Sequence, residues 1–329
     1  MDFHIGQFGY IKPVIDELID QGINPASLLK RSGLDRFQLD DNDLYVPVSS
    51  IYRFFNALDE QEGQVDILEN FYHRIQVESI SEVGETVATS ADVLTACRLG
   101  AKYNSAFLSN EQAGFDVTGN KAMFWHRAID KHDHVGGNAQ LTLLGFSYVL
   151  SGLRIATGID WAPLEIHLQS KSAPNLDAVL PPGANTKIFL EQPATAIVFP
   201  TTMLTLPMLQ QDIVDGITSE SISDTSTVSS RIEHILNGYN QETLPNIKTF
   251  ADITDMSSRT LQRRLHNEDS SYFEVIDQWR FKKALKLLAN PGLKVKDVSE
   301  HLFYANVPNF ERAFRRWTNT TPNRYRDTA

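Results

Sequence analysis

Residues 250–265 read FADITDMSSRTLQRRL, and residues 298–314 read VSEHLFYANVPNFERAF. Each stretch predicts a short helix, a tight turn and a second helix, and each second helix carries two large apolar residues four positions apart. These pairs are Leu261 with Leu265 and Phe310 with Phe314. Side chains at this spacing share one helix face, so both pairs are expected to pack inward. The duplication indicates two helix–turn–helix units in one all-helical domain.

The face opposite the apolar pair is the one that a helix–turn–helix shows to base edges in a DNA major groove. In the first unit, over about residues 247–267, this face carries Arg259, Gln262 and Arg263. A guanidinium can bond both O6 and N7 of guanine, and an amide can pair with adenine. These three side chains are therefore candidates for reading the DNA sequence.

In the second unit, over about residues 295–318, the same face carries Val307, Pro308, Asn309 and Arg312. Val307 and Pro308 form no bidentate bond with a base, although they could touch a thymine methyl group or simply begin the helix. We expect this unit to contribute more to phosphate positioning than to sequence reading.

Other basic side chains beside these faces are candidates for contacts with DNA phosphates. They are Arg264, Lys282, Lys283, Arg315 and Arg316. The two lysines belong to a long helix predicted over residues 272–289, which is expected to join the two units rigidly. Solubilising charges on a connecting helix explain these lysines equally well.

The charge of the chain divides along the sequence. The whole chain has 30 Lys and Arg against 41 Asp and Glu, a formal net charge of −11, which at face value argues against a nucleic-acid partner. From Arg231 onward there are 16 basic and 12 acidic residues, so residues 231–329 carry +4 and the remainder carries −15. Residues 216–230, GITSESISDTSTVSS, have no basic or aromatic residue and predict a linker. An anionic partner is therefore expected for the C-terminal part alone.

Residues 1–215 predict an α+β domain made of helices and a small, mostly antiparallel sheet. Apolar residues at helical spacing extend to about Leu108, and a hairpin pattern follows around Thr118-Gly119-Asn120. A buried helix is expected over Asn138–Ala156, and two strand-like runs, LEIHLQS and TAIVFPTT, come after it.

Several other classes of protein are not indicated. The apolar helix is interrupted by Gly and Ser and is too short for a bilayer, and the N-terminus has no signal-peptide pattern. Cys97, the one cysteine, is expected to be a buried, inert thiol. No nucleophile-elbow, dinucleotide, P-loop or zincin motif is present, so no enzyme, cofactor or membrane partner is predicted. The cluster of His126, His132 and His134 has the spacing of a polar loop, and no metal is predicted.

The C-terminal hundred residues resemble the DNA-binding domain of AraC/XylS-type transcription regulators. The stretches that carry the resemblance are MSSRTLQRRL, ALKLLANPG and VSEHLFYANVPNFERAFRRWTNTTPNRYR. It implies that two recognition helices enter successive major-groove segments, with base-reading roles for the seven residues named above. Four glycines of the family pattern are replaced here, by Asp255, Asp269, Phe303 and Asn319. Asp and Asn tolerate the left-handed conformation of a turn and Phe does so poorly, so the second unit is expected to depart more from the pattern.

The N-terminal part is similar, more loosely, to the effector-binding domain of the ornithine/arginine-utilisation regulators within the AraC family. The stretches LEIHLQSKSAPN and IFLEQPATAIVFPTTMLTLPM carry this similarity, which implies a domain that senses a small molecule and forms dimers. In the pocket of a small-molecule-binding domain, a few polar groups among apolar walls orient the ligand. The candidates for an effector pocket are Tyr103, Trp125, Arg127, Arg154 and His167.

The leading hypothesis is a cytoplasmic bacterial regulator, associated with the nucleoid when bound to double-stranded promoter DNA. It is expected to respond to an unknown small-molecule effector and to recruit RNA polymerase as an activator, or to block it. Two alternatives stay open. One is a metabolite-binding or enzymatic N-terminal module with secondary DNA binding, and the other is a constitutive DNA binder whose first domain only forms homodimers.

Overall fold

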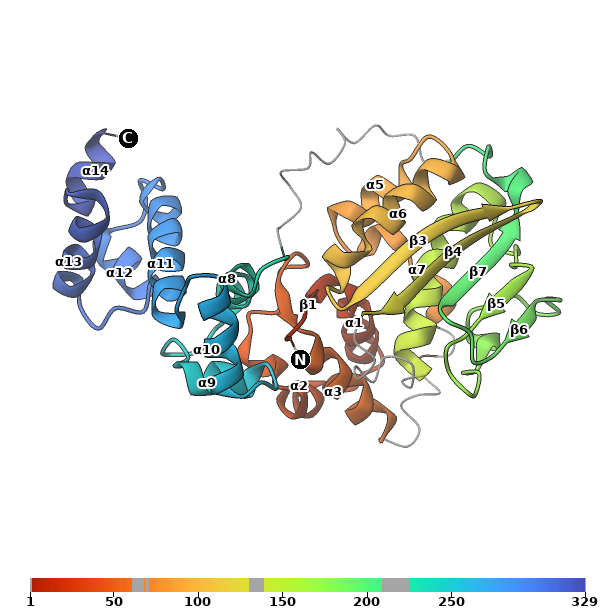
Figure 1. Cartoon of the computed structure of the whole chain (residues 1–329), viewed down its shortest axis with the longest axis horizontal. Helices are drawn as coiled ribbons and strands as arrows, with labels where there is room; N and C mark the ends of the chain where they lie inside the picture. The colour runs from red at the N-terminus through yellow and green to blue at the C-terminus, as the bar shows by residue number, and fades with distance from the viewer. Residues whose placement is uncertain (1, 61–67, 69–70, 130–138, 209–224, 329) are drawn as a thin grey trace. The chain divides into compact units, whose positions relative to one another are not determined.

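The computed structural model describes the chain except for residues 1, 61–67, 69–70, 130–138, 209–224 and 329 (Figure 1). The chain forms two compact units, Met1–Thr225 and Ser226–Ala329. Most of the linker predicted over residues 216–230 lies outside the described residues. Helix α8 begins at Val228, so the end of that predicted linker is helical.

The first half of the N-terminal unit is helical, as its pattern predicts. Its α-helices are α1 (Lys12–Asp20), α2 (Ala26–Ser32), α3 (Val48–Asp59), α5 (Glu82–Ala88) and α6 (Val93–Phe107). Short 3-10 helices lie at Phe8–Tyr10, Leu34–Arg36, Tyr72–Arg74 and Val77–Ser79, and later at Leu176–Ala178 and Thr201–Met203. Two three-residue strands, β1 (Ile5–Gln7) and β2 (Tyr45–Pro47), pair antiparallel among these helices and were not expected from the sequence.

The second half of this unit carries a five-stranded sheet with the order β3-β4-β7-β5-β6. The strands are β3 (Glu111–Thr118), β4 (Lys121–Ala128), β5 (Glu165–His167), β6 (Lys187–Phe189) and β7 (Thr195–Pro200). Every pair is antiparallel except β5 with β6, so the sheet is mostly antiparallel, as predicted. The predicted hairpin joins β3 to β4, with Thr118 opposite Lys121 and Gly119 at φ +60°, a conformation that glycine adopts without strain.

Helix α7 (Ala139–Thr157) packs inside the N-terminal unit. By length and composition alone it could cross a membrane, but 61% of its most apolar stretch is buried within the protein. The Tyr148 hydroxyl donates to the backbone oxygen of Tyr10 at 2.9 Å, which ties α7 to the N-terminal segment. The helix is therefore part of the core, as its interrupted apolar pattern predicts.

The C-terminal unit is helical throughout the part that the structure describes. Its helices are α8 (Val228–Gly238), α9 (Ile247–Ile253), α10 (Ser258–Asn267), α11 (Tyr272–Leu288), α12 (Val295–His301), α13 (Val307–Thr318) and α14 (Pro322–Thr328). The predicted units correspond to α9–α10 and to α12–α13. Both second helices begin with a side-chain cap: Ser257 accepts from the Thr260 amide at 3.1 Å and Asn306 from the Asn309 amide at 3.0 Å.

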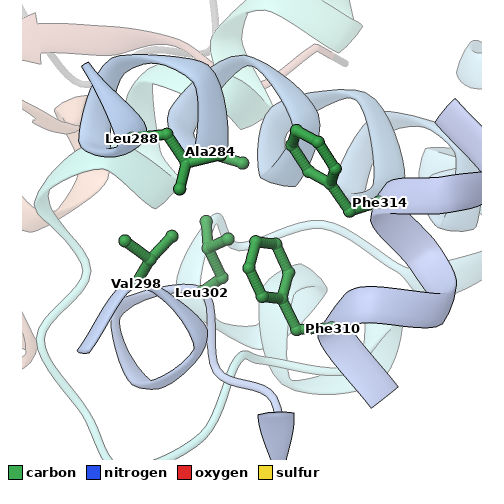
Figure 2. Close-up of a cluster of buried hydrophobic side chains, with 6 residues drawn as sticks. All are labelled: Ala284, Leu288, Val298, Leu302, Phe310 and Phe314. Atoms are coloured by element: carbon green, nitrogen blue, oxygen red, sulfur yellow. The ribbon is translucent and has the colours of Figure 1, made fainter. Parts of the chain in front are cut away.

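The second unit packs against α11, the central helix of this domain. The core between them consists of residues at most 2% exposed: Ala284, Leu288, Val298, Leu302, Phe310 and Phe314 (Figure 2). The rings of Phe310 and Phe314 are 5.7 Å apart and meet edge to face. Burying one such side chain contributes about 1.5–3 kcal/mol. This core fixes how α13 is held against α11.

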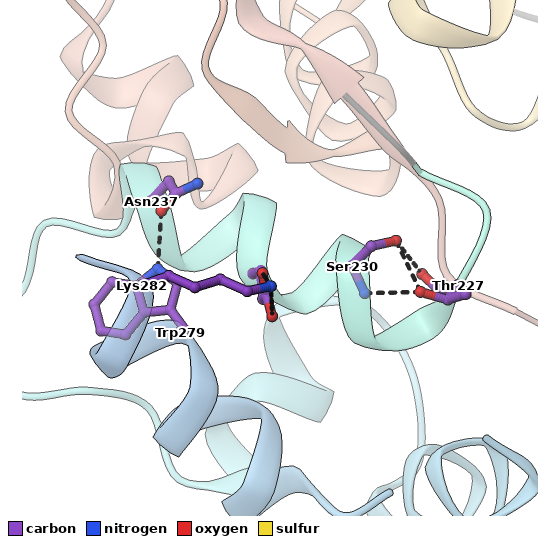
Figure 3. Close-up of polar contacts among 6 residues, drawn as sticks. Thr227, Ser230, Asn237, Trp279 and Lys282 are labelled. Atoms are coloured by element: carbon purple, nitrogen blue, oxygen red, sulfur yellow. Dashed lines mark hydrogen bonds and ion pairs between the residues drawn. The ribbon is translucent and has the colours of Figure 1, made fainter. Parts of the chain in front are cut away.

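Polar contacts join α8 to the central helix (Figure 3). The buried Trp279 indole donates to Asn237 Oδ1 at 2.8 Å, and Lys282 pairs with Glu233 at 2.7 Å. Thr227 caps α8 by accepting from the Ser230 amide at 3.0 Å. Helix α8 therefore belongs to the same folded unit as the two helix–turn–helix units.

Candidate nucleic-acid interface

Helix α10 presents the three predicted base-reading side chains of the first unit to solvent. Leu261 and Leu265 are fully buried, and Arg259, Gln262 and Arg263 are exposed on the other face. None of these three side chains forms a hydrogen bond or ion pair with the residues that the structure describes. The donors of this face are therefore available to an external partner.

Helix α13 differs, because Arg312 and Arg316 are engaged within the protein. Arg312 donates to Asn309, and Arg316 pairs with Asp277 on the central helix. Asp277 also accepts from the Trp317 indole at 2.9 Å. Pro308 and Arg312 are exposed, while Val307 and Asn309 are half-buried. The two recognition helices thus offer unequal sets of free donors.

The five predicted phosphate contacts have different surroundings. Arg315 is exposed, whereas Arg264 is half-buried and its Nε is buried without a partner among the described residues. Lys282 is held by Glu233. The Lys283 ammonium lies 4.7 Å from the centre of the Trp279 ring, and burial lowers its pKa. The contacts of these residues with DNA stay predictions.

The four residues that replace family glycines all have positive φ. The angles are +54° at Asp255, +51° at Asp269, +59° at Phe303 and +58° at Asn319. All four turns therefore keep a left-handed geometry, and the departure expected at Phe303 in the second unit does not occur. A bulky residue in this conformation is strained, so neighbouring contacts must hold it.

Those contacts come from the central helix. Arg280 Nε donates to the Leu302 carbonyl oxygen at 3.0 Å and its Nη2 to that of Phe303 at 3.3 Å. The guanidinium also lies 4.4 Å from the centre of the Tyr304 ring, and the Phe303 ring lies 6.3 Å from Trp279. Sequence reasoning missed this role of Arg280, because the carbonyls it binds stand 22 and 23 positions further along the chain.

In the N-terminal unit, Trp125 and Arg127 contact each other, and the other three candidate effector residues have partners of their own. Arg154 donates to the backbone oxygens of Val179 and Trp161, and Trp125 donates to Asp116 at 2.6 Å. The remaining contacts are Arg127 with Gln112 and the Trp125 ring, His167 with Glu165, and Tyr103 with the Lys102 ammonium. Their role toward an effector stays a prediction.

The histidine cluster is only partly described, because His132 and His134 lie outside the described residues. His126 Nδ1 lies 2.9 Å from Glu111 Oε2. No group of three metal-binding side chains occurs in the described ranges. Cys97 is buried, which raises its pKa to about 12 and agrees with the inert thiol predicted.

A duplicated helix–turn–helix unit with free arginine and glutamine donors, attached to a separate α+β unit, defines a DNA-binding transcription regulator. Residues 250–328 match the helix-turn-helix domain model, and residues 22–208 match the arabinose-binding N-terminal domain of the AraC transcription regulator. The second match covers more than half of the chain. The chain belongs to the AraC family and carries the effector-binding N-terminal domain of that family. The matched families and relatives are transcription regulators, not enzymes.

Relatives match over shorter stretches. The regulator VqsM of Pseudomonas aeruginosa is 34% identical over 84 residues, 26% of this chain and 26% of VqsM. VirS of Mycobacterium tuberculosis is 33% identical over 112 residues, 33% of this chain and 32% of VirS. The ornithine utilization regulator of P. aeruginosa is 32% identical over 83 residues, 25% of this chain and 24% of that protein. The chain thus aligns with about a quarter to a third of the length of these relatives.

Among solved structures, the transcriptional regulator CdpR of P. aeruginosa aligns over 96% of this chain and 97% of its own. The sequence identity is 18% and the TM-score is 0.38.

Proposed function

We infer that the chain binds specific promoter DNA through its two helix–turn–helix units, placed in adjacent major-groove segments, and that an effector in the N-terminal unit changes this binding. The observation that carries the proposal is the free donor set of Arg259, Gln262 and Arg263 on α10, opposite a fully buried Leu261 and Leu265. Such donors can discriminate between base pairs by about 1–3 kcal/mol per bidentate contact.

The second helix–turn–helix unit mainly positions the protein on the DNA. Arg312 and Arg316 are held by Asn309 and Asp277, which lowers their freedom to rearrange toward base edges. Arg315 is exposed and suits a phosphate. A DNA-binding domain of this kind has one helix–turn–helix unit that selects the sequence and one that fixes the position of the protein on the duplex.

Regulation requires that the effector favours one arrangement of the protein over another, because a ligand with equal affinity for both shifts nothing. RNA polymerase is the expected partner at the promoter. The protein is proposed to form a homodimer through its N-terminal unit. When bound to DNA it would lie in the nucleoid, within the cytoplasm.

The test is a DNA-binding titration of the full chain against promoter fragments and unrelated DNA over a range of salt concentrations. Specific binding that weakens with salt supports the proposal, since phosphate contacts release counterions. Equal affinity for all sequences, or no binding at low salt, would overturn it. Binding that never responds to any effector would leave a constitutive DNA binder.

A further inference from the structure

A mainly apolar cavity of about 90 Å³, partly open to solvent, lies in the N-terminal unit between α6, α7 and β4. Small residues on both helices leave this space: Ala96, Cys97 and Gly100 on α6, and Gly145 and Gly152 on α7. On each helix these positions share one face. Phe124 of β4 forms part of the wall. The volume is smaller than that of the roughly 150 Å³ enclosed cavity known to accept benzene, but this cavity is open on one side, so its occupant can be no larger than about one ring with a small substituent.

Polar groups meet the cavity at a few points. Asn104 lines it, and the Asn104 Nδ2 atom is buried without a hydrogen-bond partner among the described residues. Glu111 and His126 also line it, but they are paired with each other at 2.9 Å. Burial and the neighbouring Glu111 charge keep the pKa of Tyr10 well above its ordinary value, so its hydroxyl stays neutral. The cavity therefore offers an unused amide donor and no unpaired cation.

This pattern defines the class of ligand. A sugar would leave most of its hydroxyls unpaired against apolar walls, which opposes its binding. A carboxylate would lose its hydration and find only a cation already neutralised by Glu111. A compact apolar molecule with one uncharged oxygen would fill the cavity and accept a hydrogen bond from Asn104.

We propose that this cavity is the effector site, and that its ligand is a small, uncharged, mainly apolar molecule whose single oxygen is bound by Asn104. The proposal rests on the effector-responsive function proposed above. It uses none of the five residues named from the sequence as effector candidates, since none of them lines the cavity.

The experiment measures binding of phenol and toluene to the full chain by calorimetry. The two probes share a ring and differ only in a hydroxyl against a methyl group. Asn104→Leu is expected to weaken phenol binding about fivefold and to leave toluene binding unchanged. Ala96→Leu fills the cavity and is expected to abolish binding of both. Ser105→Leu, on the exposed face of α6, is the matched control and should change neither.

Folding is checked by circular dichroism and by DNA binding without a probe. If Ala96→Leu does not fold, Gly152→Ala replaces it, because the added Cβ would meet Val77 Cγ1 at an ordinary contact of 3.9 Å and still narrow the cavity. Benzoate and arabinose should bind at least tenfold more weakly than phenol. The proposal is wrong if the wild type binds neither ring at millimolar concentration, or if Asn104→Leu affects both probes equally. Absence of specific DNA binding in the wild type would instead overturn the proposed function.

Discussion

Arg280 Nε lies 3.0 Å from the carbonyl oxygen of Leu302 and joins the central helix α11 to the turn of the second helix–turn–helix unit. The same guanidinium reaches the carbonyl of Phe303, whose φ of +59° is unfavourable for a bulky residue. One side chain thus satisfies two carbonyl oxygens at the end of α12 and holds the turn that aims α13.

Arg280→Leu is expected to destabilise the second unit by about 1–3 kcal/mol, because two carbonyls lose a charged donor. Arg280→Lys should recover only part of this, since an ammonium lacks the planar fork and its stacking on Tyr304. Amide hydrogen exchange in α12 and α13 of the full chain measures the effect. Unchanged exchange in Arg280→Leu would show that the turn needs no such support.

Asp277 holds Arg316 away from other partners and also accepts from the Trp317 indole. Asp277→Asn keeps an acceptor for Trp317 but removes the charge that binds Arg316. The freed guanidinium is expected to bind one further phosphate, which steepens the dependence of log affinity on log salt by about 0.9.

The matched control is Glu274→Gln, which removes one exposed negative charge from the same helix without freeing an arginine. It should change the salt dependence less than Asp277→Asn does. Equal changes in the two variants would mean that only the overall charge matters.

His126 predicts a pH dependence of the N-terminal unit. Burial opposes the protonated form of His126, but the charge and hydrogen bond of Glu111 outweigh it, and the pKa of His126 is raised above its ordinary value. A raised pKa adds stability that is fully present below the ordinary value of about 6.5 and is lost as pH rises through the raised value.

The free energy of unfolding of the N-terminal unit should therefore fall as pH increases above about 6.5. In Glu111→Gln this fall should flatten, because the group that raises the pKa of His126 is gone. Denaturant unfolding of both proteins at several pH values checks this. A wild type whose stability rises over the same interval would contradict the assignment of the charged pair.

The DNA-binding unit follows from the sequence to a large extent. The spacing of Leu261 and Leu265 places α10 and its exposed face correctly, and Asp255 has the left-handed conformation expected at a glycine position. Phe303 has the same conformation, which its bulk did not predict. Local periodicity and turn geometry determine these features, and both are visible in short stretches. The contact of Arg280 with Leu302 is not visible in this way, because it depends on how α11 packs against α12.

The candidate site of the N-terminal unit, in contrast, does not follow from the sequence. Arg154 and Trp125 stand out in the sequence as polar or amphipathic residues within apolar segments, and the structure gives each an internal partner. The cavity instead results from residues that lack side-chain volume, such as Gly145 and Gly152. Glycines carry no functional group that would mark them as site residues. The space that they leave depends on how α6 and α7 pack together.

In the proposed function, α10 reads bases while α13 mainly fixes the position of the protein on DNA. The most direct test is selection of bound sequences from a random DNA library by the full chain and by its Arg263→Ala and Arg315→Ala variants, at one fixed salt concentration. We expect a defined wild-type motif that loses its preference at a guanine position in Arg263→Ala. We expect Arg315→Ala to select the same motif and to bind it more weakly. Identical motifs for the wild type and Arg263→Ala, or no motif at all, would contradict the proposed function.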